Sequence, residues 1–416
     1  MSAVAFDLPE DVITVRDGVL RFVESEIVPR VENNHALFED QRQLYDESGR
    51  YSAPVQRLIR ETRSLSAKAG FFAMCAPEEL GGGGFGHLAY YVAWEAINRR
   101  LGSHTILTPW VISHWAFGPS RVLTQVTPEA SKRCLAGMMS GETSMCFGLS
   151  EPGAGSDASM LKTRAVKTDR GWRITGRKLW TTNSPTADWC IVFAITDPAK
   201  AERKAGGISA FLVPTSAKGF SVESIVKLFG DAGGNEGALV LEDVEVEPWQ
   251  LVGKLDEGFR IAVYGVSLGR IYNSARAVGL GRWALERAVE YSQQREAFGQ
   301  KIASFQAVSH PLADAATELH AAHLLGLNAA MLLDRGERAI KELSMAKSYS
   351  VQAGFRAIDR AMQTFGGMGL TNEIGLVHIW HTLRIINIAD GTNEILARTI
   401  SQRLLAGDLE LSLIHI

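Results

Sequence analysis

The sequence has few of the features that mark several large classes of protein. Its 4 cysteines among 416 residues follow neither a paired metal-ligand spacing nor a dense disulfide pattern, which indicates a reducing compartment. The net charge of -3 excludes the basic field that nucleic acids or acidic membranes attract. No apolar run is as long as a membrane span. Asp7, Glu10 and Asp11 precede the first arginine, unlike a presequence. We therefore expect a cytoplasmic protein.

The length predicts roughly two to three domains, and the first part of the chain is helical in pattern. Apolar residues recur near a 3.6-residue period in residues 9–30. A second helix is expected over residues 54–69, ended by Gly70, and further helices from Ala89 to about Met139. The glycines at 81–84 are not followed by Lys-Ser/Thr. They therefore predict a flexible connection rather than a phosphate-binding loop.

The pattern changes near Gly141 to short runs of β-forming residues separated by Gly, Asp and Pro. The expected strands are 164–168, 172–175, 189–194, 208–213, 220–225 and 239–244. Short strands at such spacing favour an antiparallel barrel or sandwich over βαβ units. The polar stretch Asp197–Gly207 is expected to be a surface loop.

After Gly258 the chain is again helical in pattern. Pro311 is the only proline after Pro248, so long helices are possible. A bundle seam is predicted from apolar residues spaced alternately by three and four: Phe305, Val308, Leu312, Ala315, Leu319 and Ala322. Gly279–Ala284 imitates a dinucleotide motif, but it lies inside a helical pattern, where small residues serve close helix packing.

We therefore predict a mainly α-helical protein with a central β domain. The expected division is an N-terminal helical domain (1–143), a small antiparallel β-barrel or sandwich (144–253) and a C-terminal four-helix bundle (254–410). The last residues, 411–416, resemble a non-native tail and are excluded from fold reasoning.

Two segments of the β region suggest a ligand site. Cys146–Asp157 begins as a strand and ends in an open loop, in which Gly153 and Gly155 let a ligand approach the backbone. By itself this segment is equally compatible with an ordinary strand-to-loop corner. The second segment, Gly176–Asn183, is a short strand that carries Trp180 and two threonines.

In this order and spacing the two segments resemble those of the acyl-CoA dehydrogenases, flavoproteins that bind FAD beside these strands. In that family the first segment has the sequence Thr-Glu-Pro-x-Ala-Gly-Ser-Asp. This chain has Ser150 in place of the threonine and keeps the other residues, up to Asp157. The resemblance extends from about Asp11 to Gly407. It implies the helical–β–helical architecture, FAD as cofactor and an acyl-CoA substrate. It also implies an electron-transfer flavoprotein as acceptor and a homotetramer or dimer.

The resemblance further implies which residues contact the ligands. Ser156 and Arg270 match residues that contact the coenzyme A part of the substrate. Residues matching FAD contacts fall into two groups, which the family brings together between subunits: Phe147, Leu149, Ser150, Trp180 and Thr182, then Arg295, Phe298, Gln306, Gln363, Gly366, Gly367, Thr392 and Glu394.

Asp390 occupies the position of the family's catalytic glutamate, which removes the α-proton while hydride leaves the β-carbon for flavin N5. Asp is one methylene shorter, and a misplacement of about 1 Å can cost on the order of a hundredfold in rate. The other position used in the family is Gly269 here, which cannot act as a base. Asp390 is thus the expected catalytic residue, although an Asp before Thr-Asn-Glu also fits a helix N-cap.

Two other functions remain open. Nitroalkane oxidase, a flavin oxidase of the same family, also carries Asp at this position. The arginine that the family often has seven residues after its base is displaced here, because Ala397 stands at that position and Arg398 follows. This offset argues against nitroalkane oxidase, which uses an arginine near its Asp. A flavoprotein that binds acyl-CoA without turnover is the third possibility. Anaerobic flavin bleaching and oxygen consumption would discriminate among the three.

Overall fold

The computed structural model describes residues 7–409. These residues form two compact units. The helical unit comprises the chain up to Leu20, Gly86–Thr105 and the part from Ser267 onward, whereas the β-containing unit comprises Arg21–Phe85 and Ile106–Val266. The predicted tail, 411–416, lies outside the described residues. Within the described range, no helix combines the length and the apolar character that crossing a membrane requires.

The N-terminal region is helical, as predicted, but more broken than expected. The 9–30 pattern corresponds to α1 (Glu10–Phe22), a π-helical turn (Val23–Ile27) and α2 (Val28–Asn33). The short helices α3 and α4 span His35–Glu39 and Gln41–Leu44. The second prediction is confirmed by α5, which spans Ala53–Lys68.

The prediction of helices from Ala89 through Met139 is only partly correct. Helix α6 (His87–Leu101) and helix α7 (Pro128–Met139) are present. The chain between them is irregular, with 3-10 turns at Thr108–Trp110 and Arg121–Gln125. Gly102, with φ of 55°, ends α6, and two prolines later in the segment restrict further helix formation.

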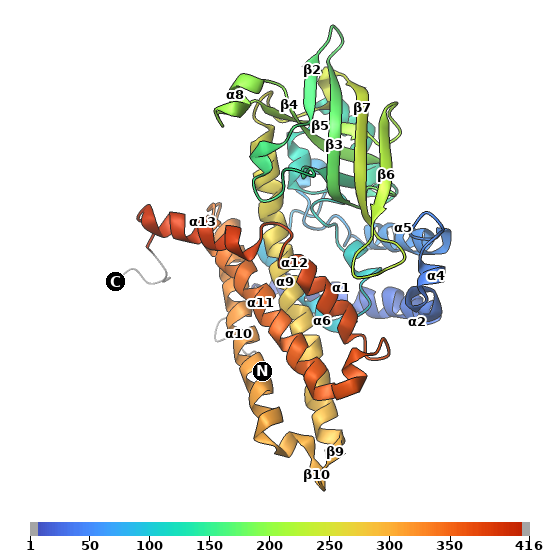
Figure 1. Ribbon diagram of the computed structural model, residues 1–416, viewed down its shortest axis with the longest axis vertical. Coiled ribbons are helices and arrows are strands. Elements are labelled where there is room, and N and C mark those ends of the chain that lie inside the picture. The colour runs from blue at the N-terminus through green and yellow to red at the C-terminus, as the bar shows by residue number, and fades with distance from the viewer. Residues whose placement is uncertain (1–6, 410–416) are drawn as a thin grey trace. The chain divides into compact units, whose positions relative to one another are not determined.

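The β-containing unit holds one mixed sheet of 8 strands among the described residues, in the order β6-β7-β3-β2-β4-β5-β8, with β1 on β4 (Figure 1). The strands are β1 Met145–Gly148, β2 Arg164–Lys167, β3 Trp172–Thr182, β4 Trp189–Ile195, β5 Ile208–Pro214, β6 Phe220–Val226, β7 Glu236–Val246 and β8 Leu251–Val252. The predicted strands are confirmed, but the sheet is not purely antiparallel. Strand β4 runs parallel to β1 and β2, because long connections separate these strands in the chain.

Residues 172–182 form a single strand rather than the two separate segments that the sequence suggested. Strand β3 runs unbroken from Trp172 to Thr182 and pairs with β7, with register shifts near Gly176 and between Lys178 and Thr181. At Gly176 a Cβ would lie 2.3 Å from Thr163 Oγ1, so only glycine fits there. The strand thereby joins the core of the sheet to the segment expected to bind FAD.

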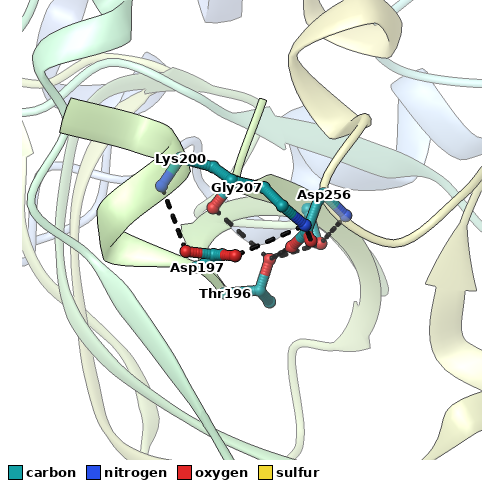
Figure 2. Close-up of polar contacts among 6 residues, drawn as sticks. Thr196, Asp197, Lys200, Gly207 and Asp256 are labelled. Carbon is teal, nitrogen blue, oxygen red and sulfur yellow. Dashed lines mark hydrogen bonds and ion pairs between the residues drawn. The ribbon is translucent and has the colours of Figure 1, made fainter. Parts of the chain in front are cut away.

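The polar stretch predicted as a loop contains a short helix, α8 (Pro198–Glu202), whose N-cap is Asp197. Figure 2 shows how this helix is attached to Asp256, in the segment that leads into the next helix. Asp256 accepts hydrogen bonds from Thr196 Oγ1 and Lys200 Nζ, each at 2.6 Å. These bonds hold Asp256 at a φ of 66°, a conformation that Asp tolerates better than most residues.

Long helices dominate the rest of the helical unit, as predicted (Figure 1). They are α9 (Gly258–Gln294, whose first residues belong to the other unit), α10 (Gln306–Asp334), α11 (Ile340–Phe365), α12 (Leu376–Ile386) and α13 (Asn393–Leu405). A hairpin of β9 (Glu296–Ala297) and β10 (Gln300–Lys301) joins α9 to α10.

The predicted bundle seam is confirmed in part. On α10 the side chains of Leu312, Ala315, Leu319 and Ala322 are buried. Phe305 is the N-cap that precedes the helix, and Phe305 and Val308 are only partly buried. Gly279 and Gly281 lie inside α9, where an added Cβ would come within 2.5 Å of Glu95 O and 2.6 Å of Leu319 Cδ2. These glycines therefore serve close helix packing and not dinucleotide binding.

Candidate active site

The turn between α12 and α13 carries Asp390 in an unusual backbone conformation. Asp390 has φ of 53° and Gly391 has φ of 99°. The cap of α13 is Thr392, whose Oγ1 accepts a hydrogen bond from Ile395 N at 3.3 Å. The alternative interpretation of Asp390 as the helix N-cap is therefore wrong, and its carboxylate is available for other work.

The carboxylate of Asp390 is oriented by a neighbour that sequence reasoning missed. Asn273 Nδ2 donates a hydrogen bond to Asp390 Oδ2 at 2.8 Å, and Asn273 itself is buried on α9. One turn earlier, Arg270 Nε donates to the Asp390 main-chain oxygen at 3.3 Å. Arg270 therefore lies beside the candidate base as well as at the position matched to coenzyme A contact.

Burial raises the pKa of Asp390 to about 6, although Lys347, Arg270 and the Asn273 hydrogen bond act in the opposite direction. A carboxylate with a pKa close to neutral is a better proton acceptor than an ordinary aspartate, and it is still ionised at pH 7. Thr392 and Glu394 follow in the same turn, and the Glu394 side chain is exposed. The candidate base and three other predicted site residues thus form one cluster in the helical unit.

In the β-containing unit the first predicted segment lies along β1 and β3. The ring of Phe147 lies 4.8 Å from the rings of both Trp115 and Phe193. Ser150 O accepts a hydrogen bond from Leu179 N at 2.9 Å. Leu149 and Ser150 are therefore held directly beside the strand that carries Trp180.

Glu151 and Lys178 form a buried ion pair that holds the loop after Ser150, and sequence reasoning missed this pair. Lys178 Nζ lies 2.8 Å from Glu151 Oε1 and 3.3 Å from Leu149 O. The Glu151 carboxylate also accepts bonds from Lys162 N at 2.6 Å, Thr163 N at 3.0 Å and Thr163 Oγ1 at 2.6 Å. Because every oxygen has a partner, the pair is well satisfied in spite of its burial.

Trp180 is strained and exposed, which is unusual for a tryptophan in a strand. It has φ of 61° at the register shift of β3, and 53% of the residue is exposed. A bulky residue in this backbone region is a genuine outlier that often marks a ligand site. Thr182, two residues later, is partly buried. The two residues matched to the flavin ring thus lie at one end of β3.

Several predicted site residues have open space where a ligand could approach. At Gly153 and Gly155, and likewise at Gly366 and Gly367, an added Cβ would meet no heavy atom of the described chain within 4 Å. Internal packing therefore does not explain these glycines. Exposed backbone amides suit the phosphates and flat rings of FAD, and the residues fit this cofactor. Ser156 is exposed in the same loop as Gly153 and Gly155.

The remaining predicted residues gather at one end of the bundle. Arg295 is exposed beside the β9–β10 hairpin, and Phe298, with φ of 52°, is 94% exposed. Tyr291, one turn before Arg295, stacks on Phe365 with ring centroids 4.3 Å apart. This contact brings the hairpin close to the end of α11, where Gln363, Gly366 and Gly367 are exposed. Gln306, also exposed, begins α10.

Comparisons with known proteins agree with this arrangement. Three sequence models match in chain order: the acyl-CoA dehydrogenase N-terminal domain over residues 9–142, the middle domain over 146–244 and the C-terminal domain over 256–405. The chain is 36% identical to human mitochondrial short-chain specific acyl-CoA dehydrogenase over 336 residues, which is 81% of this chain and 80% of that protein.

Two further relatives extend the comparison. The caffeyl-CoA reductase-Etf complex subunit CarC of Acetobacterium woodii is 33% identical over 346 residues, covering 83% of this chain and 90% of that protein. The structure of butyryl-CoA dehydrogenase from Megasphaera elsdenii superposes with a TM-score of 0.82 at 30% identity, covering 97% of this chain and 100% of that one. The chain belongs to the acyl-CoA dehydrogenase family, the FAD-dependent oxidoreductases that dehydrogenate acyl-CoA.

Proposed function

We propose that Asp390 is the catalytic base of this dehydrogenase and removes the α-proton of an acyl-CoA thioester. The observation that carries the proposal is the Asp390 carboxylate itself, fixed at 2.8 Å from Asn273 Nδ2 and with its pKa raised to about 6. A base of this strength is ionised at neutral pH and still holds a proton readily.

The proposed dehydrogenation removes one proton and one hydride from the acyl chain. The α-proton goes to Asp390, a hydride leaves the β-carbon, and the product is the trans-2-enoyl-CoA. FAD, when bound, supplies the acceptor for the hydride. Asn273 keeps the carboxylate pointing in one direction during the transfer, and the positive charge of Arg270 lies beside the turn that carries the base. Under this proposal, the two contacts offset the shorter side chain of Asp390 by keeping it in one position.

The other predicted residues receive binding roles under this proposal. Trp180 and Thr182 lie against the flavin ring, while Phe147, Leu149 and Ser150 form the wall beside it. Ser156 and Arg270 contact the coenzyme A part of the substrate. The exposed residues at the bundle end reach the FAD of a neighbouring subunit: Arg295, Phe298, Gln306, Gln363, Gly366 and Gly367.

We further propose a homotetramer that passes its electrons to an electron-transfer flavoprotein. The exposure of Phe298 supports a subunit interface, because its ring is 94% exposed in one chain although its edge meets Phe305, with ring centroids 6.1 Å apart. The CarC relative is by its name part of an Etf complex, which supports the acceptor. That name also describes a reductase, so the direction of the reaction depends on the acceptor.

An anaerobic titration with acyl-CoA thioesters tests the proposal. The parent protein is expected to lose its flavin absorbance with at least one thioester, whereas the Asp390→Asn variant binds the same thioester and stays yellow. Consumption of oxygen with a nitroalkane and no bleaching by any thioester would instead identify an oxidase. Binding without bleaching in the parent would identify a non-catalytic acyl-CoA-binding protein.

A further inference from the structure

Lys347 is a fully buried lysine in the middle of α11. Its relative exposure is 0%, and its Nζ donates a hydrogen bond to Gly391 O at 2.8 Å. An ammonium group removed from water is costly unless opposite charge and hydrogen bonds compensate it. The carbonyl that it binds belongs to the residue directly after Asp390.

The charged and titratable groups around this lysine and Asp390 come from three segments: α9, the turn that carries Asp390 and α13. The Asp390 carboxylate attracts it, and Arg270 on α9 adds a second positive charge. Glu394, in the first turn of α13, is exposed and also attracts it. Tyr272 on α9 is buried, and burial raises the pKa of its phenol, which stays neutral. Asp390, which is partly buried, is therefore the negative charge that chiefly compensates Lys347.

The contact with Gly391 has a second effect, on the backbone. Asp390 and Gly391 both have positive φ, at 53° and 99°, and such a turn persists only when its surroundings hold it. Lys347 holds the carbonyl at the end of this pair, while Arg270 Nε holds the carbonyl at its start at 3.3 Å. The two cations thus hold the two successive peptide groups that follow the candidate base.

We propose that Lys347 is a positioning residue for proton abstraction, which holds the Asp390–Gly391 turn and supplies the buried positive charge beside the base. The inference rests on the proposed role of Asp390 and adds a residue to it. Lys347 acts through Asp390 and needs no contact with the substrate.

The proposal has two separable parts, which two substitutions distinguish. Lys347→Gln keeps a donor for the Gly391 carbonyl and removes the charge. Lys347→Met removes both. Loss of the charge disfavours ionised Asp390, so the pKa of Asp390 should rise further in both variants, by about one pH unit or more. Loss of the donor should loosen the turn in the Met variant alone.

Lys341→Met is the matched control. Lys341 is also buried on α11, but its partner is Asp408, with Nζ 2.6 Å from Oδ1. The control removes a buried lysine from the same helix, and its cost in stability is of the same kind. It leaves the neighbourhood of Asp390 unchanged, so the pKa of Asp390 should not move.

The direct measurement is the pH dependence of unfolding of the FAD-loaded full chain, with and without Asp390→Asn. The pKa of Asp390 is raised from 3.8 to about 6 in the folded protein, so the folded state holds this proton more tightly than the unfolded state. The contribution of Asp390 to the free energy of unfolding is therefore fully present below about pH 4 and is lost as the pH rises to about 6. The difference in unfolding free energy between each protein and its Asp390→Asn derivative isolates this decline.

In the Lys347→Gln pair the decline should extend to about pH 7 or higher, and in the Lys341→Met pair it should still end near pH 6. As the solution is acidified, the rate of single-turnover flavin reduction should begin to fall at a correspondingly higher pH in Lys347→Gln than in the parent. In Lys347→Met the rate should in addition be lower at all pH values. An unchanged end of the decline in Lys347→Gln would overturn the proposal.

Failure of the inference is distinguishable from failure of the proposed function. If Asp390→Asn reduces its flavin at the parental rate, the role of Asp390 is wrong. If Asp390→Asn is inactive and the Lys347→Gln profile equals that of the parent, only the role of Lys347 is wrong. Should Lys347→Met not fold, the Lys347→Gln pair alone decides, since Gln retains the hydrogen bond to the turn.

Discussion

The side-chain amide of Asn273 donates a hydrogen bond to the carboxylate of Asp390, with Nδ2 and Oδ2 2.8 Å apart. Asn273 is buried on a long helix and Asp390 lies on a turn far away in the chain. The bond therefore joins a long helix of the bundle to the proposed base. The hydrogen bond fixes the direction in which the Asp390 carboxylate points.

The Asp390→Asn variant should reduce its flavin at least a hundredfold more slowly than the parent, within the 10²–10⁴ typical of general-base catalysis. FAD and acyl-CoA should bind as before, because Asn keeps the size of the side chain. Stopped-flow measurement of flavin reduction checks this. Asp390→Glu should also be slower than the parent, since the longer side chain displaces the carboxylate from Asn273. A faster Glu variant would mean that Asp is a weakened substitute.

Asn273→Leu should move the acidic limb of the pH–rate profile upward. The hydrogen bond favours ionised Asp390, so its loss raises the pKa of Asp390 above about 6. The base is active only when ionised, and activity would then be lost at a higher pH as the solution is acidified. Asn98→Leu is the control, because Asn98 is equally buried but bonds Trp94 O. An acidic limb that stays in place in Asn273→Leu would contradict the assignment.

The two arginines should have different effects. Arg295→Ala should weaken FAD retention by about 1.5–3 kcal/mol if a charge-assisted bond to pyrophosphate is lost. Arg270→Ala should raise KM for acyl-CoA with flavin content unchanged, and it should also lower kcat, because Arg270 bonds the main chain of Asp390. Equal flavin loss in both variants would show that the roles are wrongly separated. Flavin absorbance after dialysis and steady-state kinetics supply the two measurements.

The Glu151–Lys178 pair should be strongly coupled. Breaking it with Glu151→Leu or Lys178→Met leaves one buried charge unpaired and should cost about 3–5 kcal/mol of stability. The double variant should be more stable than the sum of the two losses predicts. Denaturant unfolding of the four proteins gives the coupling energy. Additive losses would mean that the two side chains act independently.

The purified protein should be yellow and should elute with an apparent mass several times that of the 45.3 kDa chain. Phe298→Ser should dissociate it, because it removes the exposed ring proposed for the interface. Val166→Ser is a suitable control, since Val166 is also an exposed apolar residue, at 63%, but lies on a short strand of the sheet. A colourless monomer that does not respond to added FAD would contradict the proposal.

Most of the fold could be predicted because its signals are local. Turn residues bound the strands, and the spacing of apolar residues on α10 fixed its buried face. The parallel pairing of β1 with β4 could not be predicted, because register between distant strands depends on tertiary contacts. The irregular conformation of residues 103–127 could not be predicted for a similar reason. It depends on contacts with neighbouring parts of the fold and not on a periodic pattern of apolar residues in the segment itself.

The candidate base was located by resemblance, whereas the residues around it required the structure. Asn273 and Lys347 are polar residues inside helical patterns, and such residues are usually solvated. A signal was nevertheless present for Lys347. Leu343, Ala346, Ser350 and Gly354 are all buried on α11, so a lysine at the same helical spacing occupies a core position. A charged residue on the buried face of an amphipathic pattern deserves to be treated as a site candidate.

The positive φ of Asp390 bears on how this enzyme can change over evolutionary time. Asp and Asn are the residues, after glycine, that most readily adopt that backbone conformation. A mutation from Asp to Asn requires a single nucleotide change and adds no strain to the turn. If Asp390 is the base, as proposed, selection for a folded protein would therefore not detect its loss. Lineages of this type can give rise to folded, flavin-containing descendants without dehydrogenase activity.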